Sequence, residues 1–87
     1  IDLRSDIYSL ACVTYEMLAG RPPFHGDSPR SIMTRHLTET PPRIRGVRPE
    51  LPGAVEEALE RAMAKDPAGR FASVGEFTRA LQADDGA

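Results

Sequence analysis

The chain has 87 residues and a formal charge of -2, so it has room for one domain at most, and its acidic balance argues against nucleic acid or an anionic membrane as the main partner. Hydrophobic residues make up 40% of the chain and charged residues 28%, which are the proportions of a folded globular protein rather than a disordered one. The single cysteine, Cys12, excludes an internal disulfide and is typical of a reducing compartment.

The first predicted helix runs from about Ser5 to Ala19. Gly20 follows at the position of a left-handed C-terminal cap, and Pro22-Pro23 prevents the helix from continuing. A helix that is apolar all round needs neighbours on several sides, so we expect other parts of a longer protein to cover it. Its apolar residues form one broad face and fill another side: Ile7, Leu10, Val13, Thr14, Met17 and Leu18, then Tyr8, Cys12 and Tyr15.

A second helix is predicted to begin at an N-cap on Asp27 or Ser28, with Pro29 at its first helical position. Residues 40–52 follow as a proline- and arginine-rich connection without periodicity. The residues of the second helix that share one stripe are Ile32, Met33, His36 and Leu37.

A third helix is predicted from Gly53 to Lys65, where the lysine suits the negative end of the helix dipole. The fourth opens with a capping box between Ser73 and Glu76. The apolar positions with helical spacing are Val55, Ala58, Leu59, Ala62 and Met63 in the third helix, and Phe77, Ala80 and Leu81 in the fourth. No stretch alternates as a strand does, so the chain is predicted to be all-helical.

No Gly-rich phosphate loop occurs, and neither histidine has a partner pattern that indicates catalysis or metal binding. His36 is interpreted as a packed or half-exposed side chain. Asp6 lies near the start of the first helix, where it is either an ordinary first-turn carboxylate or a residue with a specific role. Arg70 lies between Gly69 and Phe71, and is either a buried guanidinium that needs a carboxylate or a surface arginine.

The chain holds two motifs: the first comprises residues 2–10 (DLRSDIYSL) and 15–24 (YEMLAGRPPF), and the second comprises residues 65–71 (KDPAGRF). Together they resemble bacterial eukaryotic-like serine/threonine protein kinases. The first motif resembles the region just beyond the activation loop, and the second resembles the sequence before the last helix. Residues 24–29 (FHGDSP) resemble the receptor-like group most closely. One departure is Ala11, where the family usually has glycine.

The resemblance implies an all-α fragment, with four helices from the C-lobe of the two-lobed α+β kinase fold. Residues 1–83 are then the C-terminal portion of that lobe, without the N-lobe, catalytic loop and activation segment, and residues 84–87 are a tail or the start of a linker. Asp6 matches the aspartate that holds the catalytic loop, and Arg70 matches the arginine that pairs with the glutamate of the A-P-E motif. Glu16 matches an acidic position that contacts an arginine of bound peptides in some kinases.

The implied parent transfers the γ-phosphate of ATP, with Mg²⁺, to serine or threonine of protein substrates. This chain carries none of the catalytic, cofactor-binding or metal-binding motifs, so we expect it to be inactive and loosely packed alone. Its expected role is scaffold and docking surface, with the N-lobe, the activation segment and protein substrates as partners. The alternatives are a pseudokinase remnant, a protein-interaction module or a free-standing bundle with chance similarity.

The chain begins at Ile1 with no initiating methionine or signal peptide, as a piece cut from a longer protein would. No apolar run approaches the roughly 18 residues of a membrane span. We therefore expect a cytoplasmic location and no membrane contact by this segment, although the parent can be anchored through a segment outside it.

Overall fold

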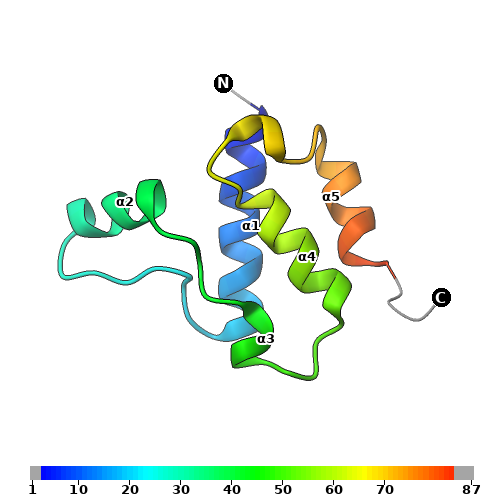
Figure 1. Cartoon of the computed structure of the whole chain (residues 1–87), viewed down its shortest axis with the longest axis horizontal. Coiled ribbons are helices and arrows are strands. Elements are labelled where there is room, and N and C mark those ends of the chain that lie inside the picture. Colours follow the sequence, from blue (N-terminus) through cyan, green and yellow to red (C-terminus); the bar gives the residue numbers. More distant parts are fainter. Residues whose placement is uncertain (1–2, 84–87) are drawn as a thin grey trace.

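The computed structural model describes residues 3–83, and every regular element within that range is a helix (Figure 1). The predicted all-helical class is therefore confirmed, whereas the tail or linker predicted for residues 84–87 lies outside the described residues. In chain order the elements are α1 (Leu3–Ala19), α2 (Pro29–Thr38), α3 (Ile44–Val47), α4 (Gly53–Ala62), the 3₁₀ turn η1 (Pro67–Gly69) and α5 (Val74–Leu81).

The body of the molecule consists of α1, α4 and α5, with α4 packed between the other two (Figure 1). α1 buries Ile7, Ala11 and Tyr15, whose spacing of four places them on one face. Phe77 of α5 is 1% exposed and its ring centroid lies 5.6 Å from that of Phe71. The other buried apolar residues are Phe24, Ile44, Ala58, Leu59, Ala62 and Met63.

Residues 40–52, predicted to lack regular structure, contain the short helix α3. Ile44 is 2% exposed and anchors this turn in the core, while the amide of Arg45 donates to Oε1 of Glu56 at 3.2 Å. The prediction missed α3 because a four-residue turn is too short to show a helical period.

The third predicted helix ends at Ala62 instead of Lys65. Met63 leaves the helical conformation at φ -101° and ψ 14°, while its amide still donates to the carbonyl of Leu59. Met63 stays buried as the chain turns, so apolar spacing counted it as helical. Lys65 is thereby free for a contact outside the helix, described below.

The predicted left-handed cap after α1 is confirmed. Gly20 has a φ of 80°, and its amide donates to the carbonyl of Glu16 at 2.8 Å. A side chain at this φ is strained, which explains why glycine suits the position.

The capping box predicted for α5 forms only in part. The hydroxyl of Ser73 accepts from the Glu76 amide at 3.1 Å, but the Glu76 carboxylate accepts from the amide of Ala72 rather than that of Ser73. A complete box occurs instead at α2, between Ser28 and Ser31.

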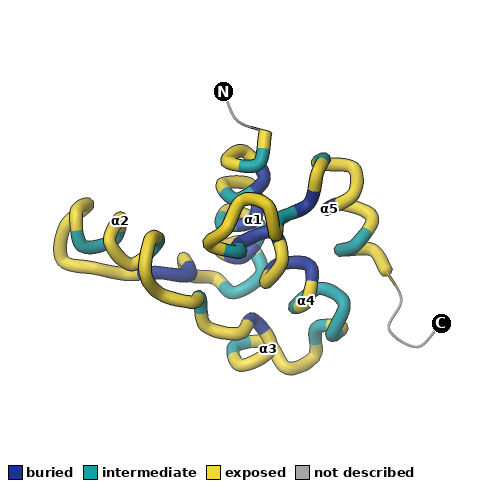
Figure 2. Tube along the Cα trace, turned by 45° about the horizontal axis from the view of Figure 1, so that its top comes forward, coloured by how far each residue is buried: buried dark blue, intermediate teal, exposed yellow. Residues whose placement is uncertain are grey.

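α2 differs from the other long helices because none of its residues is buried. Figure 2 shows buried segments in α1, α4 and the turn before α5, and only intermediate or exposed ones in α2. The predicted stripe of Ile32, Met33, His36 and Leu37 therefore does not form a core face: Met33 is 65% exposed and Leu37 is 72% exposed.

Candidate functional site

Arg70 follows η1 and is half-buried against the start of α1. Its Nε donates to the carbonyl of Ala64 at 2.7 Å, its Nη1 to that of Arg4 at 3.1 Å and its Nη2 to that of Lys65 at 3.4 Å. Its Cζ also lies 4.7 Å from the centroid of the Tyr8 ring. The guanidinium thus ties the turn after α4 to the first turns of α1.

No carboxylate among residues 3–83 forms an ion pair with Arg70. Backbone carbonyls and the face of an aromatic ring meet its charge instead, and both stabilise a guanidinium. Within residues 3–83, Arg70 is therefore neither the buried guanidinium with a carboxylate partner nor the surface arginine of the two sequence-based interpretations, but a half-buried one held by carbonyls and a ring.

Asp6 is exposed in the first turns of α1 and makes no side-chain hydrogen bond or ion pair within residues 3–83. Arg70 bonds the carbonyl of Arg4, two residues before Asp6. The structure therefore places Asp6 and Arg70 at the same end of α1 without joining them directly.

Glu16 is exposed near the other end of α1. Ten residues of helix separate it from Asp6, a rise of about 15 Å. Glu16 is thus distant from the Asp6 and Arg70 end, and the structure does not bring all three predicted residues together.

Beside Arg70 lies a group of side chains that the sequence analysis did not assemble, here called the Tyr8 cluster: Tyr8, Cys12, Phe24, His36, Lys65 and Arg70. The Tyr8 hydroxyl lies 2.8 Å from Nδ1 of His36, and the two ring centroids are 5.7 Å apart. The His36 ring also meets Phe24 edge-on, with centroids 4.7 Å apart. These contacts join α1, the turn before α2 and α2 itself.

Lys65 completes the Tyr8 cluster from the segment after α4. Its Nζ donates to the carbonyl of His36 at 2.7 Å and lies 4.9 Å from the centroid of the Phe24 ring. The predicted role for Lys65 at the end of a helix is therefore wrong, because α4 has already ended at Ala62. The spacing of Tyr8 and Cys12 places them on one helix face, but no pattern links them to residues 36 and 65.

The Tyr8 cluster shifts several pKa values in directions set by its partial burial. Burial raises the pKa of Tyr8 to about 12 and raises that of the Cys12 thiol. Burial, and then the positive charge of Lys65, lower the pKa of His36. At neutral pH, Tyr8 therefore keeps its proton as a donor, His36 is uncharged and Cys12 is a thiol rather than a reactive thiolate.

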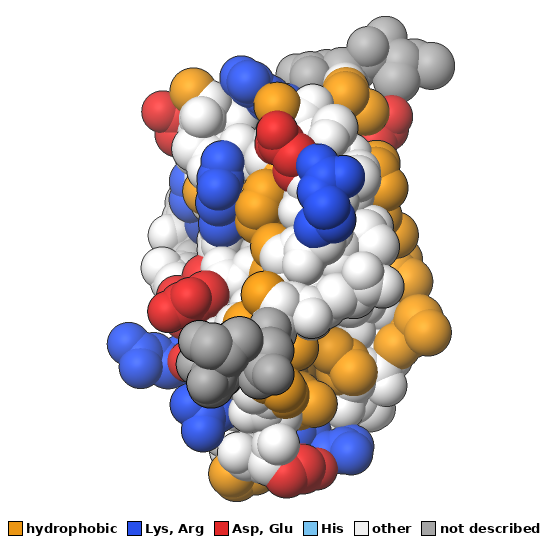
Figure 3. Space-filling model, turned by 90° about the vertical axis from the view of Figure 1, so that its right-hand side faces the viewer, with side chains coloured by type: hydrophobic (Ala, Val, Ile, Leu, Met, Phe, Trp, Pro, Cys, Tyr) orange, Lys and Arg blue, Asp and Glu red, His pale blue; other side chains and the backbone are white. Residues whose placement is uncertain are grey.

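One side of α1 remains uncovered. Met17 is 78% exposed, Val13 56% and Leu10 38%, although all three are apolar. This agrees with the prediction that the other three predicted helices do not suffice to cover the whole circumference of the first one. Figure 3 shows the side of α5, which carries both groups of hydrophobic side chains and charged ones.

Among residues 3–83, no group of three or more histidine, cysteine, aspartate or glutamate side chains is arranged to hold a metal ion. Within the same range, no helix combines the length and hydrophobicity that a membrane crossing requires.

Comparisons with known proteins agree in sequence and in fold. The chain is 48% identical over 79 residues to a probable serine/threonine-protein kinase PknB of Bifidobacterium longum, and 42% identical over 80 residues to the serine/threonine-protein kinase PknE of Mycobacterium tuberculosis. The PknI kinase domain of M. tuberculosis superposes with a TM-score of 0.72 over 94% of this chain, at 33% identity. No family model matches.

The chain matches the C-terminal part of the large lobe of a bacterial eukaryotic-like serine/threonine kinase. This kinase-lobe segment covers 88% and 92% of its own length in the two sequence matches, but only 11% and 14% of those relatives. It likewise covers 28% of the PknI kinase domain chain. The likeness therefore extends over nearly all of this chain and a small part of each relative.

Proposed function

We propose that this kinase-lobe segment serves a longer protein, here called the parent kinase, that transfers the γ-phosphate of ATP to serine or threonine hydroxyls of protein substrates. ATP and Mg²⁺ are its cofactors, bound by parts outside this chain. The observation that carries the proposal is that sequence likeness to these kinases covers 88% and 92% of the chain and fold likeness covers 94% of it. Phosphoryl transfer depends on positioning and electrostatics, and this segment contributes positioning.

Asp6 is proposed to hold the backbone of the catalytic loop. Its exposed carboxylate in the first turns of α1 leaves both oxygens available to accept hydrogen bonds from another segment. Its role is therefore that of a positioning residue.

Arg70 is proposed to pair with the glutamate that closes the activation segment. The three backbone carbonyls that hold it fix the position of the guanidinium in advance, and a preorganised guanidinium loses less entropy when it binds a carboxylate. Tyr8 supports the same position from its ring face.

Glu16 is proposed to contact a basic residue of the bound substrate, and its exposure is compatible with that role.

α2 and the turn before it are proposed as part of the docking surface for substrates or regulators. The exposed Met33 and Leu37 support this, because apolar side chains accessible on a helix suit a protein partner. We place this segment in the cytoplasm.

The test is an assay of phosphate transfer from labelled ATP to a protein substrate by the parent kinase. Asp6→Asn removes the charge at nearly constant size, and we expect the rate to fall by up to about a hundredfold, since small misplacements of reacting groups have such effects. Glu57→Gln, on the exposed side of α4, is the matched control and should retain the rate. A parent protein that transfers no phosphate would contradict the proposal and favour a pseudokinase or interaction module.

A further inference from the structure

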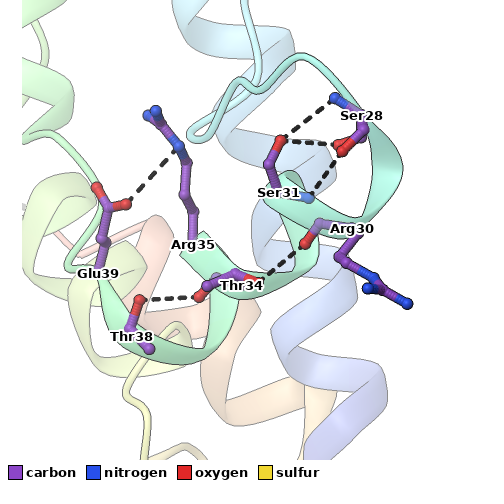
Figure 4. Close-up of polar contacts among 7 residues, drawn as sticks. All are labelled: Ser28, Arg30, Ser31, Thr34, Arg35, Thr38 and Glu39. Carbon is purple, nitrogen blue, oxygen red and sulfur yellow. Dashed lines mark hydrogen bonds and ion pairs between the residues drawn. The ribbon is translucent and has the colours of Figure 1, made fainter.

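α2 buries no side chain in the core, so core packing does not hold it to the body of α1, α4 and α5. None of its residues is buried, and among residues 3–83 the side chains of Ser31, Thr34, Arg35 and Thr38 bond only within the helix or to its two caps (Figure 4). Thr34 and Thr38 donate to carbonyls four residues earlier, and Arg35 pairs with Glu39 at 3.7 Å. The placement of α2 must therefore depend on the few contacts that leave it.

Those contacts converge on His36. Its ring Nδ1 faces the Tyr8 hydroxyl at 2.8 Å, its carbonyl accepts from Nζ of Lys65 at 2.7 Å, and its ring packs edge-on against Phe24. One residue of α2 thus contacts α1, the turn before α2 and the segment after α4.

The titratable groups around this ring are mostly neutral or positive. α1 presents Tyr8 and Cys12, both held protonated by burial. The segment after α4 presents the Lys65 ammonium, and Arg70 lies over the Tyr8 ring. The carboxylate whose charge works to raise the pKa of Lys65 is that of Glu39, just beyond α2. This carboxylate is paired with Arg35 and half exposed.

We propose that His36 positions α2 on the helical body, and that it does so only while its imidazole is uncharged. With its proton on Nε2, the uncharged ring accepts the Tyr8 hydrogen bond at Nδ1 and adds no charge beside Lys65. A protonated ring carries hydrogen on both nitrogens, so Nδ1 can only donate and the bond to Tyr8 must reverse. It also brings a positive charge close to the Lys65 ammonium.

The direction of the pH effect follows from proton linkage. Burial and Lys65 lower the pKa of His36, so the docked state binds the proton less tightly than a state in which α2 is released. Docking by this contact is therefore fully present above the ordinary histidine pKa and is lost as the pH falls through the lowered value. α2 becomes a proton-sensitive element of the surface.

The experiment measures hydrogen–deuterium exchange of α2 amides in the parent protein at about pH 7.5 and about pH 5.5, where histidine changes charge. The protection factor is the intrinsic exchange rate divided by the measured rate at the same pH, and α4 serves as the internal reference. We expect α2 protection to fall by about three- to tenfold at the lower pH, the range of one net hydrogen bond, with α4 unchanged.

His36→Gln is the deciding variant, because the glutamine amide can accept a hydrogen bond but cannot be protonated. Its α2 protection should be the same at both pH values. His25→Gln is the matched control: His25 is exposed in the turn before α2, and this variant should keep the wild-type pH response. An equal fall in the His36→Gln variant, or no fall in the wild type, would overturn the proposal.

Tyr8→Phe gives a second test that leaves both histidines in place. It removes the hydroxyl and keeps a ring for Arg70, so α2 protection at about pH 7.5 should fall by about three- to tenfold. Unchanged α2 protection in this variant would also overturn the proposal. Exchange reports on the order of α2 directly, so these results do not depend on the proposed kinase activity.

Discussion

The body of α1, α4 and α5 and the isolated helix α2 are held by different forces. Within residues 3–83, the core around the body contains eleven buried apolar residues, seven of them on these three helices, and non-directional burial resists small changes in charge or pH. α2 buries none and depends on directional contacts at His36. The difference shows that a surface helix attached by polar contacts can change its position without disturbing the core.

The largest expected effect is on the unfolding free energy and comes from a substitution in the body. Phe77→Ala removes a ring that is 1% exposed and packs on Phe71, and should lower the unfolding free energy of the parent kinase by about 3–5 kcal/mol. Met33→Ala, on exposed α2, should change it by less than about 0.5 kcal/mol. Urea denaturation of both variants makes the comparison, and equal losses would contradict it.

The next effect tests the anchor between the body and the turn after α4. Arg70→Ala deletes three charged hydrogen bonds and the contact with the Tyr8 ring, and should cost about 2–3 kcal/mol of unfolding free energy. Arg70→Lys keeps the charge but cannot reach all three carbonyls, so it should lose part of this amount. A lysine variant as unstable as the alanine variant would show that geometry matters and charge does not.

A smaller effect tests the cap at the end of α1. Gly20→Ala forces a side chain into a φ of 80° and should cost about 1–2 kcal/mol. Gly46 in α3 is the matched control, because an added Cβ there meets nothing within 4 Å and its φ is not positive. Thermal denaturation should separate the two variants, and similar losses would refute the strain argument.

The smallest effect tests the ion pair at the end of α2. Glu39→Gln removes the exposed pairing with Arg35 and should change stability by only about 0.3–0.5 kcal/mol. Because salt screens exposed charges, the difference should vanish at about 1 M salt. A loss that persists at high salt would mean that Glu39 does more than pair with its neighbour.

Several features followed from the sequence because they depend on neighbouring residues. The Ser28 cap, Pro29 at the start of α2 and Gly20 at the end of α1 are local, and each occurs where it was predicted. The α4 stripe was also readable, because a ten-residue helix shows its period. The kinase resemblance rested on contiguous motifs, and the comparisons support it over nearly the whole chain.

The sequence by itself thus determined the four longer helices, the caps at Gly20 and Ser28, and the family resemblance. Only the tertiary structure decided that α2 stands outside the core, that Glu76 reaches Ala72, and that Lys65 bonds the carbonyl of His36. The roles assigned to Asp6, Glu16 and Arg70 remain predictions. The physical reason is range. Caps and helical periods are set within a few residues, whereas the Tyr8 cluster joins residues 28 and 29 positions apart in the chain, and no local sequence pattern predicts such contacts.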